Sequence, residues 1–189
     1  MRKLKLQVQV SVDGYVADPN GALDWMTWTM DEKLLGLINA LTDSSDTILL
    51  GRKMTDEFVK YWEAVTPDSP EFAFAKKMTG TPKVVFSKTL SKSNWDNTTL
   101  ANGDIVEEVN KLKNQKGKDI VVYGGAGFVS SLIKEGLIDE FNFFVNPVMI
   151  NKGMRIFDLL NKRQKLTLLH ATGYDCGVAV LSYKLNNEQ

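Results

Sequence analysis

The sequence predicts an α/β protein with a mostly parallel central sheet, helices on both faces of that sheet, and antiparallel strands at its C-terminal end. Strand-like runs alternate with helical patterns over most of the chain, which is the order that produces a parallel sheet. Residues 47–50 are continuously apolar, as expected of a strand buried on both faces. Segments 166–174 and 178–185 flank Asp175-Cys176-Gly177 with no helix between them, so we expect an antiparallel hairpin there.

The first strand is predicted over residues 4–10, where apolar residues alternate with lysine and glutamine, and it ends before the turn at Asp13. The loop that follows is unusually rich in aromatic side chains. Thr29 and Glu32 have the spacing of a capping box, and apolar residues at helical spacing continue beyond them. These signals predict a helix over about 30–42.

The buried strand 47–50 ends at Gly51, and a second helix is expected to open near Thr55. A third helical pattern covers about 70–79. It leads to a strand over 83–86, which ends in small polar residues.

Another helix is predicted to start at Asn102 or Gly103 and to close at Gly117. A β-branched run then leads into three glycines. The helix after these glycines stops at Gly136 and precedes a strand over 138–145.

The bulk composition indicates one domain, spanning residues 1–189. The 189 residues are 43% hydrophobic, enough for one substantial core but too few for two domains of usual size. Lys+Arg and Asp+Glu are each 23, so no whole-protein charge attracts nucleic acid or an anionic membrane. We therefore expect neither partner.

The chain has too few cysteines for an intrachain disulfide and too few cysteines and histidines for a zinc site. Cys176 is the single cysteine, which excludes an intrachain disulfide, and with His170 as the one histidine no zinc cluster is expected. The N-terminus has no signal-peptide pattern and no run is long enough for a membrane span. These features predict a soluble, cytoplasmic protein without a metal.

The most informative stretch is 119–128, in which a β-branched run breaks into Gly124, Gly125 and Gly127 just before a helix. Glycine lets the backbone approach a phosphate, and the helix N-terminus supplies free N–H groups and a partial positive charge. The stretch reads G-x-G-x-x-S, so the third glycine of the Rossmann pattern is absent and an ordinary Rossmann domain is not expected. The alternative is a tight turn without a ligand.

Three turns of this kind follow predicted parallel strands. They are Gly51-Arg52, Ser87-Lys88-Thr89 and Gly124 to Gly127. Ligands of such sheets bind at the carboxyl ends of the strands, so the three turns together predict a nucleotide or dinucleotide site.

Five motifs in order resemble the dihydrofolate reductase-like family, which includes the C-terminal reductase domain of the bacterial riboflavin-biosynthesis protein. The motifs are Ser11-Val12-Asp13-Gly14, Ile48-Leu49-Leu50-Gly51-Arg52, Val84-Val85-Phe86-Ser87-Lys88-Thr89-Leu90, Val122-Tyr123-Gly124-Gly125, and Gly136-Leu137-Ile138-Asp139-Glu140 with Pro147-Val148. The resemblance covers nearly the whole chain and implies a three-layer sandwich.

The resemblance also implies NADPH as the hydride donor. The residues that it places near the cofactor are Gly51, Arg52 and Lys53 at a helix start, Ser87 and Lys88 near the adenosine 2′-phosphate, and Gly124, Gly125, Ala126, Gly127 and Phe128 along the pyrophosphate. Arginine suits this task because its planar fork can hold two phosphate oxygens, and lysine adds a point charge.

Hydride transfer needs a ring near the nicotinamide and often a proton donor, so a carboxylate among aromatic residues is the expected catalytic group. Asp24 beside Trp25 and Trp28 fits best; Asp13 is a weaker candidate, since Asp-Gly is common turn chemistry. Each of these residues also has a structural explanation, as a turn, cap or core residue. The expected substrate-binding residues are Tyr15, Trp25, Trp28 and Trp62.

Two departures from the riboflavin-pathway members restrict the substrate. Tyr15 and Tyr123 stand where those members typically have a lysine and a glutamate. A flat, less charged ring, pterin-like or pyrimidine-like, therefore leads, and the riboflavin-pathway reduction of 5-amino-6-(5-phosphoribosylamino)uracil is the alternative.

Two non-enzymatic alternatives remain open. One is a nucleotide-binding module without turnover. The other is a homodimeric scaffold in which Phe141, Phe143, Phe144 and Val145 form an interface rather than a core.

Overall fold

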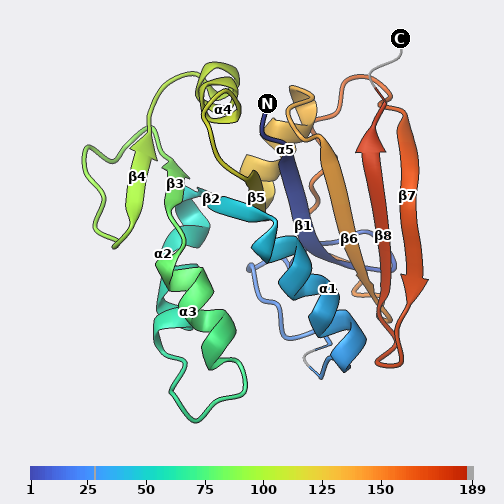
Figure 1. The fold of residues 1–189 in the computed structure, drawn as a ribbon. Coiled ribbons are helices and arrows are strands. Elements are labelled where there is room, and N and C mark those ends of the chain that lie inside the picture. The colour runs from blue at the N-terminus through green and yellow to red at the C-terminus, as the bar shows by residue number, and fades with distance from the viewer. Residues whose placement is uncertain (28, 187–189) are drawn as a thin grey trace.

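Eight strands form one sheet in the computed structural model, which describes residues 1–27 and 29–186 (Figure 1). The strands are β1 Leu4–Ser11, β2 Ser45–Gly51, β3 Lys83–Phe86, β4 Thr98–Ala101, β5 Asp119–Gly124, β6 Glu140–Asn146, β7 Leu166–Gly173 and β8 Ala179–Leu185. Their order in the sheet is β4-β3-β2-β5-β1-β6-β8-β7. Every pair from β4 to β6 is parallel, and β8 is antiparallel to both of its neighbours. The predicted fold class is confirmed.

Five helices cover the two faces of the sheet. They are α1 Glu32–Asp43, α2 Arg52–Glu63, α3 Phe72–Gly80, α4 Ile105–Lys113 and α5 Ala126–Lys134. The first three pack on one face and the last two on the other. None of the described helices is both long and apolar enough to cross a membrane.

Strand alternation divides the core into two layers. On β1, Leu4, Leu6 and Val8 point toward α4 and α5 in the largest apolar cluster. On β2, Ile48 and Leu50 point the other way, toward α2 and α3. Because successive side chains of a strand point to opposite faces, this alternation builds the three-layer sandwich.

Several predicted boundaries were wrong for local reasons. Asp31, rather than Thr29, caps α1, because its carboxylate accepts a hydrogen bond from the backbone N–H of Leu34. Helix α2 starts at Arg52, directly after the glycine, and not near Thr55. Helix α4 ends at Lys113, before Gly117.

The short strand β4 was not predicted, since its sequence Thr-Thr-Leu-Ala offers too little periodicity. The predicted C-terminal hairpin is present, and its second strand, β8, lies between β6 and β7.

Candidate functional site

The three predicted turns meet at the carboxyl edge of the sheet. Strands β3, β2 and β5 are neighbours, and their pairing places Gly51 opposite Phe86 and Leu50 opposite Gly124. The aromatic rings of Phe86 and Phe128 pack with their centroids 4.8 Å apart, which joins the end of β3, where the Ser87-Lys88-Thr89 turn begins, to α5. The structure therefore brings together side chains and turns that lie far apart in the sequence.

Two of these glycines are required by the backbone and by packing. Gly125 has φ of 71° and ψ of 106°, in a region that residues with a Cβ rarely adopt. A Cβ on Gly51 would lie 2.7 Å from the Cβ of Phe128, so only glycine lets the start of α2 approach α5 this closely.

The helices that start at this edge have open N-termini. Gly51 and Gly125 are the N-cap residues of α2 and α5, and neither helix has a side-chain cap. By contrast, α1 and α4 are capped by Asp31 and Asp104. Helix α3 also lacks a side-chain cap, but it starts away from this edge (Figure 1). Two sets of unpaired N–H groups and two positive dipole ends therefore converge here.

Helix α2 contributes one internal contact to the glycine turn. The backbone N–H of Gly125 points at the Sδ atom of Met54 at 3.0 Å. Because a thioether is a weak acceptor, this contact leaves the turn able to bind a stronger acceptor such as a phosphate oxygen.

Gly127 has no structural requirement for glycine. It is exposed, lies in the first turn of α5, does not have a positive φ, and a Cβ at this position would have nothing within 4 Å. Ala126 and Phe128, on either side of it, are half-buried. The surface over the start of α5 is thus open.

Arg52 lies beside the loop that follows β3. Its guanidinium donates to Asp56 at 3.2 Å and lies 5.9 Å from the ring centroid of Trp95, whose indole N–H donates to the same carboxylate at 3.1 Å. This exposed ion pair contributes little stability, so the Arg52 guanidinium can leave Asp56 and bind another anion. Lys53, the next residue, is exposed.

Ser87 and Lys88 differ in what they can offer. The buried Ser87 hydroxyl accepts from the backbone N–H groups of Thr89 and Leu90, which closes a turn after β3. Lys88 is exposed on the same turn.

The chain leaves β5 and β1 toward opposite faces of the sheet. These two strands are neighbours, but β5 leads through the glycine turn to α5 on one face, and β1 leads through the loop 12–31 to α1 on the other face. Ligands of open α/β sheets bind where neighbouring connections diverge in this way. The glycine turn after β5 and the loop with the predicted catalytic residues therefore leave the same edge of the sheet from neighbouring strands.

Asp13 fastens two loops at this edge of the sheet. Its carboxylate accepts hydrogen bonds from the Ser11 hydroxyl at 2.7 Å and from the backbone N–H groups of Asn151 at 2.7 Å and Ile150 at 3.2 Å. These bonds, led by that from Ser11, lower the pKa of Asp13. A carboxyl group of lowered pKa is ionised at neutral pH and is a poor proton donor.

Tyr15 contacts a cationic side chain, Arg155, that was not predicted from the sequence. The guanidinium of Arg155 donates to the Tyr15 hydroxyl at 2.9 Å and lies 4.7 Å from the centroid of its ring. Arg155 is exposed. Because this contact joins residues far apart in the chain, no sequence pattern indicated it.

Asn146 holds the loop with the aromatic residues against the sheet. Its buried side chain accepts from the backbone N–H of Thr27 at 2.8 Å and donates to Gln9 at 2.8 Å. The sequence could have indicated Asn146, because it is a polar residue at the end of a predicted strand and therefore at the same edge of the sheet. Asp24 is exposed on this loop, and the neighbouring Trp25 is half-buried.

The indole N–H of Trp25 is buried and has no acceptor among the described residues. Trp28 lies outside the described residues.

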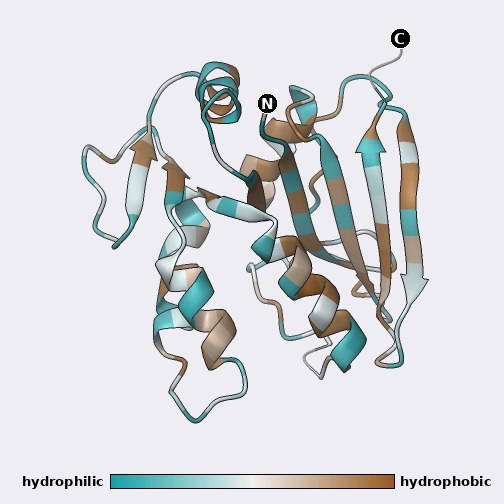
Figure 2. Ribbon diagram, viewed as in Figure 1, coloured by the Kyte–Doolittle hydropathy of each residue, from teal (hydrophilic) through white to brown (hydrophobic). Residues whose placement is uncertain are grey.

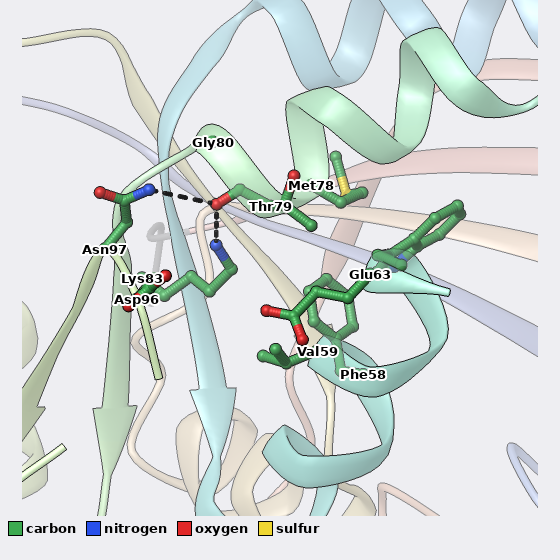
Figure 3. A pocket seen from close by; sticks show the side chains of 10 residues that line it. Phe58, Val59, Glu63, Met78, Thr79, Gly80, Lys83, Asp96 and Asn97 are labelled. Carbon is green, nitrogen blue, oxygen red and sulfur yellow. Dashed lines mark hydrogen bonds between the residues drawn. The ribbon is translucent and has the colours of Figure 1, made fainter. Parts of the chain in front are cut away.

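Trp62 does not lie with the other predicted residues. It packs against Phe58, Tyr61 and Phe74 near the end of α2, and it lines a pocket of about 170 Å³ at the start of β3 (Figure 3). The buried ammonium group of Lys83 donates there to the carbonyl oxygens of Thr79 and Thr81 at the end of α3, and burial lowers its pKa. Lys83 thus caps a helix C-terminus, a structural use of its charge.

Tyr123 is also separate from Tyr15. Its ring packs against Phe58, with centroids 5.9 Å apart, and its hydroxyl bonds to that of Thr42 at 3.1 Å. Burial raises the pKa of Tyr123 to about 12. The two tyrosines therefore do not form one aromatic pocket.

The described residues contain no group of three or more histidine, cysteine, aspartate or glutamate side chains placed to bind a metal ion.

Comparisons with known proteins agree with this fold. The model of the RibD C-terminal domain matches residues 2–180. The uncharacterized protein YyaP of Bacillus subtilis is 33% identical over 186 residues, which covers 98% of this chain and 96% of the relative.

Two solved structures share the fold. A putative riboflavin biosynthesis protein from Shewanella sp. PV-4 has a TM-score of 0.76 at 23% identity, over 99% of this chain and all of the other. The diaminohydroxyphosphoribosylaminopyrimidine deaminase/5-amino-6-(5-phosphoribosylamino)uracil reductase of Thermotoga maritima has a TM-score of 0.71 at 15% identity, over 98% of this chain and 57% of the other.

Proposed function

This chain belongs to the family of RibD C-terminal domains, a reductase-like family, and we propose that it is an oxidoreductase that transfers hydride from NADPH to a small heterocyclic molecule. We place its site at the carboxyl edge of β5 and β1. We place the protein in the cytoplasm, with no nucleic-acid partner, on the charge and cysteine content of the chain.

The observation that carries the proposal is the pair of open helix N-termini at one edge. Helices α2 and α5 begin at glycines, have no side-chain caps, and lie next to an exposed glycine that the fold does not require. Such N-termini bind phosphate groups through backbone N–H donors. We assign the pyrophosphate to them, along Gly51 and Gly124 to Phe128.

The 2′-phosphate of NADPH is assigned to the charged side chains beside these helices. Arg52 and Lys88 carry the main positive charge, with Lys53 and the Ser87 hydroxyl as further donors. Because NADH lacks this phosphate, the assignment predicts a preference for NADPH.

NADPH, when bound, supplies the hydride, and the chain must hold the acceptor ring and provide a proton. We assign the proton to Asp24, whose exposed carboxyl group lies on the loop held by Asn146. Trp25, Trp28 and Tyr15 are proposed to contact the ring. Asp13 is assigned a positioning role, since its carboxylate fastens the loop that follows β6.

The riboflavin-pathway alternative gains one specific observation. Tyr15 stands where the riboflavin-pathway members typically have a lysine, and Arg155, whose guanidinium lies over the Tyr15 ring, returns a positive charge to this position. A phosphorylated ribosylaminopyrimidine, the kind of substrate named for the Thermotoga maritima protein, would use that charge.

Cofactor binding is the first experiment. Titration of the purified protein with NADPH and NADH, followed by quenching of tryptophan fluorescence, should show tighter binding of NADPH. Replacing both Arg52 and Lys88 by alanine should weaken NADPH far more than NADH. Replacing the exposed Lys60 and Lys111 by alanine removes the same charge away from the site and should leave both affinities unchanged. Equal losses for the two cofactors would overturn the 2′-phosphate assignment.

Turnover is the second experiment. NADPH oxidation is followed by absorbance with dihydropteridine and aminopyrimidine acceptors. Asp24→Asn should lower the rate and leave NADPH affinity unchanged. Tight NADPH binding without oxidation by any acceptor would instead support the non-enzymatic binding module.

A further inference from the structure

One carboxylate joins helix α2 to the loop that carries Lys88. Oδ2 of Asp56 accepts a hydrogen bond from Nη1 of Arg52 at 3.2 Å, and Oδ1 of the same group accepts from the indole Nε1 of Trp95 at 3.1 Å. Trp95 lies on the loop 87–97 between β3 and β4, and Lys88 is exposed near the start of that loop. Asp56 thus links the two elements whose positive charges we assign to the 2′-phosphate.

The loop 87–97 is held in place mainly by polar contacts. Figure 2 shows mostly hydrophilic residues along it. The Ser93 hydroxyl donates to the carbonyl oxygen of Trp95 at 3.0 Å and accepts from its backbone N–H at 3.1 Å. The Asn102 side chain donates to the carbonyl oxygen of Leu90 at 2.7 Å. The half-buried ring of Trp95 packs against the apolar cluster between the sheet and α2. The ring is therefore fixed in position.

Arg52 keeps most of its capacity to donate hydrogen bonds. A guanidinium has five N–H donors in one plane, and among the described residues Arg52 donates only to Asp56. Its side chain is 38% exposed, and that of Asp56 is 62% exposed. The guanidinium carbon lies 5.9 Å from the centroid of the Trp95 ring, within the range of cation–π attraction. The ring thus holds the guanidinium while its other donors stay available to an anion.

Asp56 and a 2′-phosphate compete for the same guanidinium. A phosphate monoester carries more negative charge at neutral pH than a carboxylate, so it is the stronger partner of Arg52. NADH has a neutral hydroxyl at this position, which does not displace the carboxylate. The charge of Asp56 also repels the phosphate and leaves the hydroxyl unaffected. This carboxylate therefore lowers the preference for NADPH that Arg52 provides.

We propose that Trp95 and Asp56 set the preference between NADPH and NADH. The Trp95 ring positions the Arg52 guanidinium, and the Asp56 carboxylate occupies it until a 2′-phosphate takes its place. Both are positioning residues, because the contact with the phosphate belongs to Arg52. This inference rests on the proposed function, in which Arg52 binds that phosphate. Neither Trp95 nor Asp56 was predicted from the sequence.

Isothermal titration calorimetry with NADPH and NADH tests the role of Trp95, since this method does not depend on tryptophan fluorescence. Trp95→Leu removes the ring and should weaken NADPH binding about threefold, with NADH binding unchanged. Trp95→Phe keeps an aromatic face for the guanidinium and should retain most of the NADPH affinity. This conservative variant also separates loss of the ring face from loss of the fold.

The same titrations test the role of Asp56. Asp56→Asn removes the competing charge and should tighten NADPH binding about threefold, with NADH binding unchanged. Because the effect is electrostatic and exposed, the gain should shrink as the salt concentration rises. Glu57→Gln makes the same change at the next residue of α2, which is also exposed, and should leave the ratio of the two affinities unchanged.

The outcomes separate this inference from the proposed function. An equal change for both cofactors in Trp95→Leu, or an Asp56→Asn variant with the same affinity ratio as Glu57→Gln, would overturn the inference. If Arg52→Ala loses the preference for NADPH while the Trp95 and Asp56 variants keep the natural ratio, the inference alone fails and the proposed function stands. Equal binding of NADPH and NADH by the natural protein would overturn both the inference and the 2′-phosphate assignment.

Discussion

Two glycines of the same stretch should respond in opposite ways to the same substitution. Gly125 has φ of 71° and ψ of 106°, whereas Gly127 is a helical residue in the first turn of α5. We predict that Gly125→Ala destabilises the protein and that Gly127→Ala stabilises it. The two sites are only two residues apart, so each variant is the control for the other.

The magnitudes follow from the backbone and the space around each site. A Cβ at Gly125 would lie 3.6 Å from the Cα of Gly51, an ordinary contact, so its cost comes from the backbone conformation alone, about 1–3 kcal/mol. A Cβ at Gly127 meets nothing within 4 Å. Alanine there restricts the unfolded chain and favours the helix, which should add about 0.5 kcal/mol.

The free energy of unfolding is measured by urea denaturation with circular dichroism, and the dependence on urea should be the same for all three proteins. If both variants shift the unfolding free energy in the same direction, the conformational explanation is wrong.

The Gly127 variant also separates stability from cofactor binding. Its added methyl group would occupy the open space where we place the pyrophosphate. NADPH affinity should therefore fall by about tenfold or more, or ~1.4 kcal/mol, in a protein that is more stable than the original. Unchanged NADPH affinity would show that the pyrophosphate does not lie against the start of α5.

Three other substitutions test separate parts of the structure. Lys113→Met leaves the Asp139 carboxylate without the buried ammonium group 2.6 Å away, and should cost roughly 2–3 kcal/mol, less than for a fully buried pair; the exposed Lys111→Met is its control. Asp13→Asn tests the lowered pKa of Asp13: a depressed folded-state pKa adds stability above the ordinary value of about 3.9 that is lost as the pH falls through the folded value. The difference in unfolding free energy between the natural protein and this variant should be largest above about pH 5 and shrink in acid; a constant difference contradicts the argument. Trp25→Phe removes a buried N–H without an acceptor among the described residues, and should leave stability unchanged or raise it by up to about 1 kcal/mol in urea denaturation.

The convergence of the three phosphate-type turns could be predicted from the sequence. The segments ending at Gly51, Phe86 and Gly124 each had the pattern of a buried strand, and each was followed by glycine or a small polar residue. Parallel strands present their carboxyl ends at one edge, so the fold class alone placed these turns together. Their neighbouring positions in the order β3-β2-β5 came only from the structure.

The loop side of the candidate site was less predictable. Aromatic residues near Asp24 suggested a substrate pocket, but Trp62 lies near the end of α2 in another cluster. Spacing along the chain did not reveal the position of Trp62. This residue lies in the last turn of α2, and the helix runs away from the sheet edge at which it begins. Arg155 on Tyr15 was missed for a related reason, because a single arginine in a loop has no periodic signal.

Apart from the short strand β4, the sequence by itself determined the strand and helix types, the order of the elements and the chemistry of most turns. These are local properties, set by apolar periodicity and by residues such as Gly125 that permit particular backbone angles. Tertiary structure alone decided which distant side chains meet, as with Asn146 and the backbone of Thr27, and which surfaces stay uncovered, as with β7. Such contacts depend on how whole elements pack, and packing distances are not encoded in any short stretch of residues.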